Sequence, residues 1–150
     1  MEYCEEGDLL TFVEEKKIRL PRDLPILFCL ARDMALGLRT MHRLGFIHRD
    51  IKPNNIFLKR VKGRLVAKIG DFDHTREMAE SMTKSKIGTE AFNSPEIHLR
   101  QDYDLSSDIF SLGVTLIYMF AGAYPFKFHN LSKSFKELEE LTNPNITDII

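Results

Sequence analysis

One short segment constrains this chain more than any other. The stretch IHRDIKPNNIFL, residues 47–58, places charged and amide side chains between apolar flanks that would otherwise form one continuous strand. Asp50, Lys52 and Asn55 follow one another closely where the chain leaves a predicted helix and returns as a strand. Their polar groups can therefore converge at one edge of the fold, which makes the segment a candidate for chemistry.

A second acid, Asp71, follows the next apolar run along the chain. A hairpin between the two runs can bring Asp71 opposite Asn55, and carboxylate and amide oxygens are ligands that Mg²⁺ prefers. Phosphoryl transfer suits this set, because one carboxylate orients a hydroxyl, an amide and a carboxylate hold the metal, and a lysine neutralises the moving phosphate. Taken alone, a His-Arg-Asp triplet is equally typical of a capping or turn element.

Hydrophobic spacing predicts helices towards both ends of the chain. Apolar residues recur at helical intervals over residues 24–44, and Gly45 indicates the C-terminal stop. A buried helix is predicted over residues 106–120, and a polar one over residues 134–141. The fold is therefore expected to be mainly helical.

Two short strands are predicted in the middle of the chain, at residues 56–58 and 65–69, joined through a Lys-Gly turn that suits a hairpin. We interpret the charged side chains around this turn as solvated, with a phosphate-binding patch as the alternative; they are Lys59, Arg60, Lys62 and Arg64. Residues 75–89 are polar and without a clear period, so a long functional loop is expected there.

Composition excludes several classes of protein. The chain has 150 residues, 43% of them hydrophobic, which fits one globular domain. With 21 basic and 22 acidic residues, the net charge of -1 gives no electrostatic reason for a nucleic-acid partner. Two cysteines are too few for a disulfide framework or a zinc cluster, and the start of the chain shows no signal peptide. We therefore expect an intracellular, cytoplasmic protein.

An uncharged stretch at residues 109–126 allows two interpretations. Its length matches the shortest membrane-spanning helices, roughly 17 residues. However, polar residues and glycines dilute it, and neither an aromatic belt nor a basic flank marks its ends. From the residues alone we expect the central helix of a folded core and no membrane span, with a membrane-spanning helix as the alternative.

Four motifs together resemble the signature set of eukaryotic protein kinases in order and spacing. They are HRDIKPNN at residues 48–55, Asp-Phe at 71–72, Gly-Thr at 88–89 and Ser-Pro-Glu at 94–96. The resemblance covers nearly the whole chain. It implies an α+β, mainly helical C-terminal kinase lobe with a small β-hairpin region: residues 1–150 as a partial kinase domain with hinge, catalytic loop, activation segment and central helix.

The resemblance also implies roles for individual residues. Asp50 matches the catalytic base, Asn55 and Asp71 match the magnesium ligands, and Lys52 matches the residue beside the transferred phosphate, so that Asp50, Lys52 and Asn55 form the catalytic set. ATP and magnesium are the implied cofactors. Lys52 also favours serine/threonine over tyrosine specificity.

The first residues, MEYCEEGDL, resemble the kinase hinge. The resemblance implies that backbone groups of Glu2 and Cys4 face adenine, that Asp8 lies near the ribose and that Phe57 forms the adenine floor. With Lys52, Asn55 and Asp71 they complete the implied nucleotide-binding set. From the residues alone Asp8 is a helix N-cap, and both roles are compatible.

Further kinase landmarks concern support and regulation. The resemblance implies that His48 and Phe72 belong to a hydrophobic column behind the site, and that Arg49 meets a phosphorylated activation loop. Ser85, with Thr83 as second choice, is the expected phosphosite for an upstream kinase.

Asp108 resembles the family acid that braces the catalytic loop. The alternative for Asp108 is a simple charge in the first turn of a helix.

Asp73 departs from the family pattern, because it replaces the glycine of Asp-Phe-Gly. If this segment is extended, Asp73 points to the same side as Asp71 and alters the dependence on magnesium. Backbone strain, a changed loop path or a solvent-facing side chain are the alternatives.

Two function classes remain at this point. The first is a serine/threonine kinase that transfers the terminal phosphate of ATP to protein substrates. The second is a catalytically inactive kinase-like binding or scaffold module. The 150 residues contain no glycine-rich loop or Val-Ala-Ile-Lys strand of an N-terminal lobe, and the last helices of the C-terminal lobe are missing. We therefore expect a fragment of a longer kinase, inactive by itself.

Overall fold

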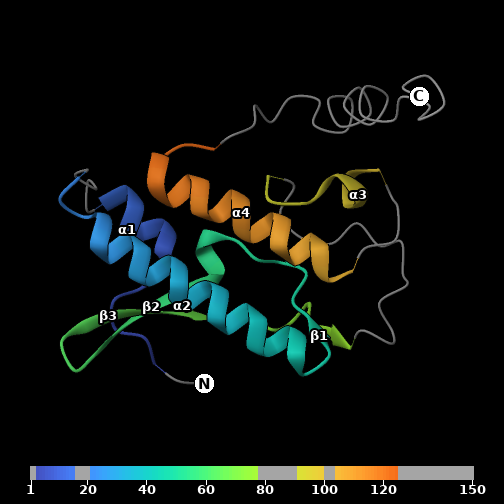
Figure 1. Cartoon of the computed structure of the whole chain (residues 1–150), viewed down its shortest axis with the longest axis horizontal. Coiled ribbons are helices and arrows are strands. Elements are labelled where there is room, and N and C mark those ends of the chain that lie inside the picture. The colour runs from blue at the N-terminus through green and yellow to red at the C-terminus, as the bar shows by residue number, and fades with distance from the viewer. Residues whose placement is uncertain (1–2, 16–20, 78–90, 100–103, 125–150) are drawn as a thin grey trace, which may run out of the picture.

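The computed structural model describes residues 3–15, 21–77, 91–99 and 104–124. Helix α2 (Leu24–Arg43) lies between helix α4 (Leu105–Ala121) and the hairpin strand β3 (Arg64–Ile69), with the short helix α1 (Leu9–Glu15) near its N-terminal end (Figure 1). The expected helix over residues 134–141 lies outside the described residues. About half of the fold is helical and the strands are small and antiparallel, as the sequence predicts.

Helix α2 forms because its apolar residues return every three or four positions. Leu27, Leu30, Met34 and Leu38 are fully buried and face the core. The helix ends where Gly45 adopts a φ of 83°, which glycine reaches at little cost, and its N–H donates to the carbonyl of His42 at 3.0 Å. The predicted helix and its stop are confirmed.

The hairpin joins β2 (Ile56–Val61) to β3 in antiparallel register, with Ile56 opposite Ile69. Both turn residues have positive φ, 50° at Lys62 and 80° at Gly63, which matches the right-handed twist of the strands. The pairing places Asn55 and Gly70 next to one another at the open end, where the Gly70 N–H donates to the Asn55 carbonyl at 2.9 Å.

The N-terminal segment pairs with the free edge of β2. The N–H of Leu58 donates to the carbonyl of Gly7 at 2.8 Å, and the N–H of Glu6 donates to the carbonyl of Leu58 at 3.2 Å. Asp8 then begins α1, because its Oδ1 accepts the N–H of Thr11 at 2.8 Å. The predicted N-cap is therefore present, and the pairing holds this segment beside Phe57.

Two short segments form a second pair of strands that the sequence did not predict. Strand β1 (Phe46–Ile47) pairs antiparallel with β4 (Arg76–Glu77). The prediction of a loop over residues 75–89 is therefore wrong at its start. Residues 76–77 show no strand pattern in the sequence, but they become a strand because their backbone pairs with β1. Residues 78–90 lie outside the described part of the chain, so Thr83, Ser85 and the Gly-Thr motif are not placed.

Helix α4 is the predicted central helix. It begins at the N-cap Asp104, whose Oδ1 accepts the N–H of Ser106 at 2.7 Å, and ends at Gly122 with a φ of 65°. Val114, Thr115 and Met119 are buried along it. None of the described helices is long and apolar enough to cross a membrane.

Tyr118 on α4 gives the fold a dependence on alkaline pH. Its hydroxyl lies 3.4 Å from Glu14 of α1 and its ring stacks on Tyr124. Burial, followed by the nearby Tyr124 and Glu14, raises the pKa of Tyr118 from 10.0 to about 12. The contribution of Tyr118 is therefore fully present below pH 10 and is lost as the pH rises to about 12, because the unfolded chain releases this proton first.

When the pH rises from 10 to 12, the free energy of unfolding should fall less for Tyr118→Phe than for the unsubstituted chain, because phenylalanine has no proton to release. Urea unfolding at a series of pH values measures this difference. Equal pH dependence in the two proteins would show that Tyr118 ionises normally.

Candidate functional site

Three of the predicted site residues meet around one carboxylate. Nζ of Lys52 lies 2.7 Å from Oδ2 of Asp50, and Nδ2 of Asn55 donates to the same oxygen at 3.0 Å. The same Nδ2 donates to the backbone carbonyl of Asp50 at 2.8 Å. The one-turn helix η1 (Pro53–Asn55) turns the chain back and makes these contacts possible. A buried carboxylate is thus held by a cation and an amide, with both of them on one of its oxygens.

His48 connects this loop to the end of the hairpin. Its Nδ1 accepts the N–H of Asp50 at 3.3 Å, and its Nε2 lies 3.1 Å from the carbonyl of Gly70. A neutral ring with its hydrogen on Nε2 satisfies both contacts. Burial lowers the pKa of His48, against the opposing influence of the Gly70 carbonyl and nearby carboxylates, and this favours the neutral form. His48 therefore orients Asp50 without adding charge.

Asp108 of α4 fixes the backbone of the same loop. Its Oδ2 accepts the N–H of His48 and its Oδ1 accepts the N–H of Arg49, each at 2.8 Å. Nε2 of His42, at the end of α2, lies 2.8 Å from Oδ2. Asp108 is 1% exposed, so the reading of it as only a first-turn charge is wrong. One buried carboxylate joins α2, α4 and the loop that carries Asp50.

The backbone of the site is unusual at two positions. Arg49 has a φ of 71° and Asp71 a φ of 60°, and glycine is the residue that tolerates such angles. Each such residue costs about 1–3 kcal/mol, and residues of this kind cluster at functional sites. These two positions lie at the start of the loop around Asp50 and just beyond the hairpin.

Asn55 and Asp71 are suited in chemistry to hold a divalent cation. Nδ2 of Asn55 makes both of its side-chain hydrogen bonds to Asp50, which leaves Oδ1 without a protein donor among the described residues. Asp71 is one residue beyond Gly70, the hydrogen-bonded neighbour of Asn55. An amide oxygen and a carboxylate oxygen are hard ligands, and phosphate and water oxygens can complete such a shell. No group of three or more His, Cys, Asp or Glu in the described parts is arranged as a metal site.

A pocket of about 640 Å³ opens beside Asp71, within the usual size of small-molecule sites. Its lining residues come from the N-terminal segment, β2, β3 and the segment after β3: Tyr3, Cys4, Gly7, Asp8, Phe57, Lys68, Ile69, Gly70, Asp71 and Phe72. Four predicted nucleotide-binding residues are among them. A Cβ at Gly70 would lie 2.8 Å from the Phe57 ring, so glycine leaves room for this ring in the pocket wall. Glu2 lies outside the described residues.

The predicted hydrophobic column is only partly present. His48 is fully buried and its ring centre lies 5.5 Å from that of Phe72, but Phe72 is 55% exposed. The expected core role of Phe72 is therefore wrong for the described residues, since its ring has a neighbour on the His48 side and is otherwise largely open. Arg49 is buried, and its Nε donates to the carbonyl of His74 at 2.7 Å.

The expected geometry of Asp73 is also wrong. Asp71 is left-handed rather than extended, and the segment then turns, with the N–H of Thr75 donating to the carbonyl of Phe72 at 3.0 Å. Asp73 is exposed and is not among the residues with positive φ. The backbone at Asp73 does not require a glycine. Having aspartate here instead of the family's glycine therefore causes no backbone strain, and it does not place the Asp73 side chain on the same side as that of Asp71.

Several residues of the site were missed in the sequence, and His42 and Lys68 are two of them. His42 lies at the end of a long helix, and nothing in its local pattern indicates its contact with a carboxylate 66 positions later. Lys68 lines the pocket from β3, where the alternation of the strand alone does not separate a pocket face from a solvent face.

The charged side chains of the hairpin turn fit the interpretation as surface turn residues better than the alternative of a phosphate-binding patch. Nε of Arg60 lies 2.7 Å from Glu6, and Nη2 of Arg64 donates to both oxygens of Asp33 at 3.1 Å. Each guanidinium is therefore neutralised locally. Lys62 is an exposed turn residue.

Comparison with known proteins identifies relatives over most of the chain. The family model described as the protein kinase domain matches residues 1–148. Serine/threonine-protein kinase ATG1a of Arabidopsis thaliana is 34% identical over 139 residues, which covers 92% of this chain and 22% of that protein. Serine/threonine-protein kinase Nek5 of Homo sapiens is 38% identical over 135 residues, covering 89% and 19%. The chain thus spans about a fifth of the length of these relatives.

Proposed function

The chain belongs to the protein kinase family, and from that premise we propose that it carries the catalytic lobe of a serine/threonine kinase, which transfers the terminal phosphate of ATP to protein hydroxyl groups. The observation that carries this proposal is the cluster of Asp50, Lys52 and Asn55 around one buried carboxylate. The names of the relatives support the serine/threonine class.

Two residues of the cluster, Asp50 and Lys52, act directly on the reacting groups in the proposed reaction. Asp50 orients the attacking hydroxyl and accepts its proton, for which a carboxylate at hydrogen-bond reach is required. Lys52, already 2.7 Å from that carboxylate, places a positive charge where the phosphate moves. The neutral His48 and the Asp108 brace keep the carboxylate in position.

The 640 Å³ pocket is the proposed nucleotide site. Phe57 offers an apolar face for a base, Asp8 a carboxylate for a ribose hydroxyl, and the Cys4 segment its backbone groups. Asn55 and Asp71 are the proposed magnesium ligands. When bound, the metal neutralises charge on the phosphates. The proposal retains Ser85 or Thr83 as the site of an upstream kinase.

The alternative function is a catalytically inactive binding or scaffold module, and Asp73 was the residue in the sequence that supported it. Because Asp73 is exposed and its backbone is unstrained, it gives no reason to expect a blocked site. The kinase reading is therefore the one we carry forward.

Phosphate transfer tests the proposal directly. The N-terminal lobe of the Arabidopsis relative is fused ahead of Met1 of this chain, and the fusion receives labelled ATP, magnesium and casein. We expect label on serine or threonine, and none from the same fusion with Asp71→Ala. Absence of transfer from a folded fusion that binds ATP would favour the binding-module alternative.

The exposed turn position of Asp73 yields a second measurable expectation. In the same fusion, Asp73→Gly should change the magnesium concentration for half-maximal activity by less than about twofold, because exposed charges are screened. Asp71→Asn is the contrasting variant and should raise that concentration at least about tenfold. A large shift for Asp73→Gly would restore a metal role for this residue.

A further inference from the structure

Gly70 lies in the wall of the 640 Å³ pocket, and its backbone conformation does not explain why a glycine is found there. The described glycines with a positive φ are Gly7, Gly45, Gly63 and Gly122, and Gly70 is not one of them. An alanine at position 70 therefore meets no backbone strain. The reason for a glycine has to be sought in the space that a side chain at this position would occupy.

The ring of Phe57 occupies that space. A Cβ at Gly70 would lie 2.8 Å from both Cδ2 and Cε2 of Phe57, well inside the roughly 3.5–4.0 Å at which carbon atoms pack. A Cβ at Gly37 would lie 3.4 Å from Ile69, and a Cβ at Gly113 would meet nothing within 4 Å. Gly70 is therefore the described glycine at which an added methyl group forces a neighbour to move.

The backbone around Phe57 and Gly70 is held by hydrogen bonds on several sides. Strand β2 pairs with β3 along one edge. Along the other edge the N–H of Leu58 donates to the carbonyl of Gly7 at 2.8 Å. Gly70 is held in turn by its N–H, which donates to the carbonyl of Asn55 at 2.9 Å. A side chain at position 70 is thus expected to turn the Phe57 ring to another rotamer rather than to move the strands.

The pocket is the open space into which the ring can turn. Phe57 is half-buried, whereas its chain neighbours Ile56 and Leu58 are fully buried in the core. Phe57 also lines the pocket together with Gly70. A ring that turns away from position 70 would therefore occupy space that a planar ligand needs.

We propose that Gly70 is a specificity-determining residue of this pocket. Because Gly70 has no side chain, the Phe57 ring lies back against β3 and leaves the pocket open to a flat heteroaromatic ring, with which an aromatic side chain can stack. The inference depends on the proposed function for the identity of that ring as adenine, but not for the opening of the pocket. Gly70 acts through Phe57, so it is a positioning residue.

The probe is adenosine, titrated into the full 150-residue chain and followed by ligand-observed NMR. Adenosine has no phosphate, so its binding does not involve the proposed magnesium ligands. Gly70→Ala should weaken adenosine binding at least about tenfold, because the added methyl group overpacks the pocket wall. Gly113→Ala is the matched control, since it adds the same group where nothing lies within 4 Å, and it should change the affinity by less than about twofold.

A second substitution separates displacement of the ring from a general disturbance of the site. Phe57→Leu alone should weaken adenosine binding about threefold, because leucine keeps an apolar contact but loses the stacking. In the double variant Gly70→Ala/Phe57→Leu the methyl group no longer meets a ring, so the affinity should lie within about twofold of that of Phe57→Leu. A double variant that binds no better than Gly70→Ala would show that position 70 acts through the backbone, and would overturn the proposal.

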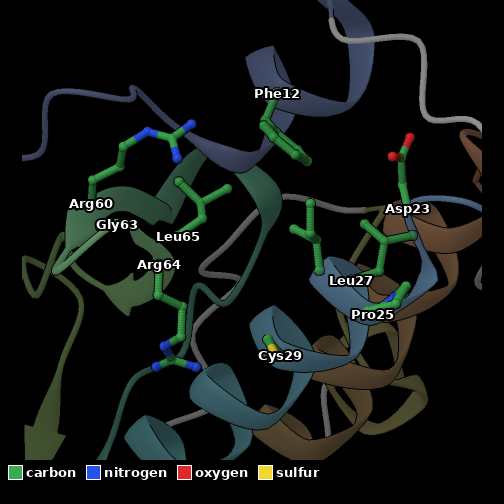
Figure 2. Close-up of a pocket in the computed structure, with 10 residues that line it drawn as sticks. Phe12, Asp23, Pro25, Leu27, Cys29, Arg60, Gly63, Arg64 and Leu65 are labelled. Atoms are coloured by element: carbon green, nitrogen blue, oxygen red, sulfur yellow. The ribbon is translucent and has the colours of Figure 1, made fainter.

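Cys4 reports on the pocket in the absence of any ligand. It lines the pocket, whereas the other free thiol, Cys29, lines a separate cavity (Figure 2). In Gly70→Ala the displaced ring should slow alkylation of Cys4 by N-phenylmaleimide at least about threefold relative to Cys29, because access limits the reaction of a thiol. The double variant should restore the rate, and urea unfolding confirms that each variant is folded.

The two measurements distinguish this inference from the proposed function. Equal Cys4 rates in the unsubstituted chain, Gly70→Ala and the double variant would overturn the role of Gly70. Absence of adenosine binding by the unsubstituted chain would contradict the nucleotide assignment instead, and the Cys4 rates would still decide whether Gly70 keeps the pocket open.

Discussion

Replacing Asp50 by asparagine in the fusion is expected to lower turnover by about 100- to 10,000-fold, the usual contribution of a positioned acid–base group. Asparagine keeps the shape of the side chain and its contact with Asn55, but it removes the charge that attracts Lys52 at 2.7 Å and the oxygen basicity that a hydroxyl proton needs. The loss should therefore fall on the chemical step.

Nucleotide affinity should change by less than about threefold in the same variant, because Asp50 does not line the 640 Å³ pocket. Steady-state rates and a separate titration with magnesium-ATP distinguish the two quantities. Asp73→Asn is the matched control, with the same chemical change on an exposed turn, and should retain turnover. A variant at position 50 that keeps normal turnover would reject Asp50 as the catalytic base.

Asp108→Ala should lower the free energy of unfolding by about 3–5 kcal/mol, the cost of breaking a buried charged network. The substitution leaves the N–H groups of His48 and Arg49 without their acceptor, and it separates His42 from its partner. Since small domains are stable by only about 5–15 kcal/mol, this variant should be close to unfolding.

Asp104→Ala supplies the comparison on the same helix. Asp104 is exposed and caps the first turn through Ser106, so its loss should cost about 1 kcal/mol. Asp108→Asn should fall between the two, because an amide oxygen still accepts one N–H. Urea unfolding of the 150-residue chain measures all three, and similar values for Asp104→Ala and Asp108→Ala would show that the brace contributes little.

Local patterns in the sequence determined the helices and the hairpin. The spacing of Leu27, Leu30, Met34 and Leu38 dictates a buried helical face whatever lies against it. The Lys62-Gly63 pair suits a two-residue turn because glycine accepts positive φ, so the strands and their register follow from neighbours in the chain. The close spacing of Asp50, Lys52 and Asn55 likewise allowed their cluster to be predicted.

Contacts between distant residues were decided only by the tertiary structure. The carboxylate of Asp108 meets His42 and the loop at His48 because the end of α2 lies beside the start of α4, and no local period encodes this packing. The sequence analysis expected Asp71 and Asp73 to lie on the same side of an extended segment, but the backbone of Asp71 is left-handed. Pairing and burial around a residue select its φ more strongly than sequence propensity does. A cavity of about 410 Å³, lined by Phe12, Leu27 and Leu65 among others (Figure 2), likewise exists only because the hairpin turn lies against α1 and the start of α2.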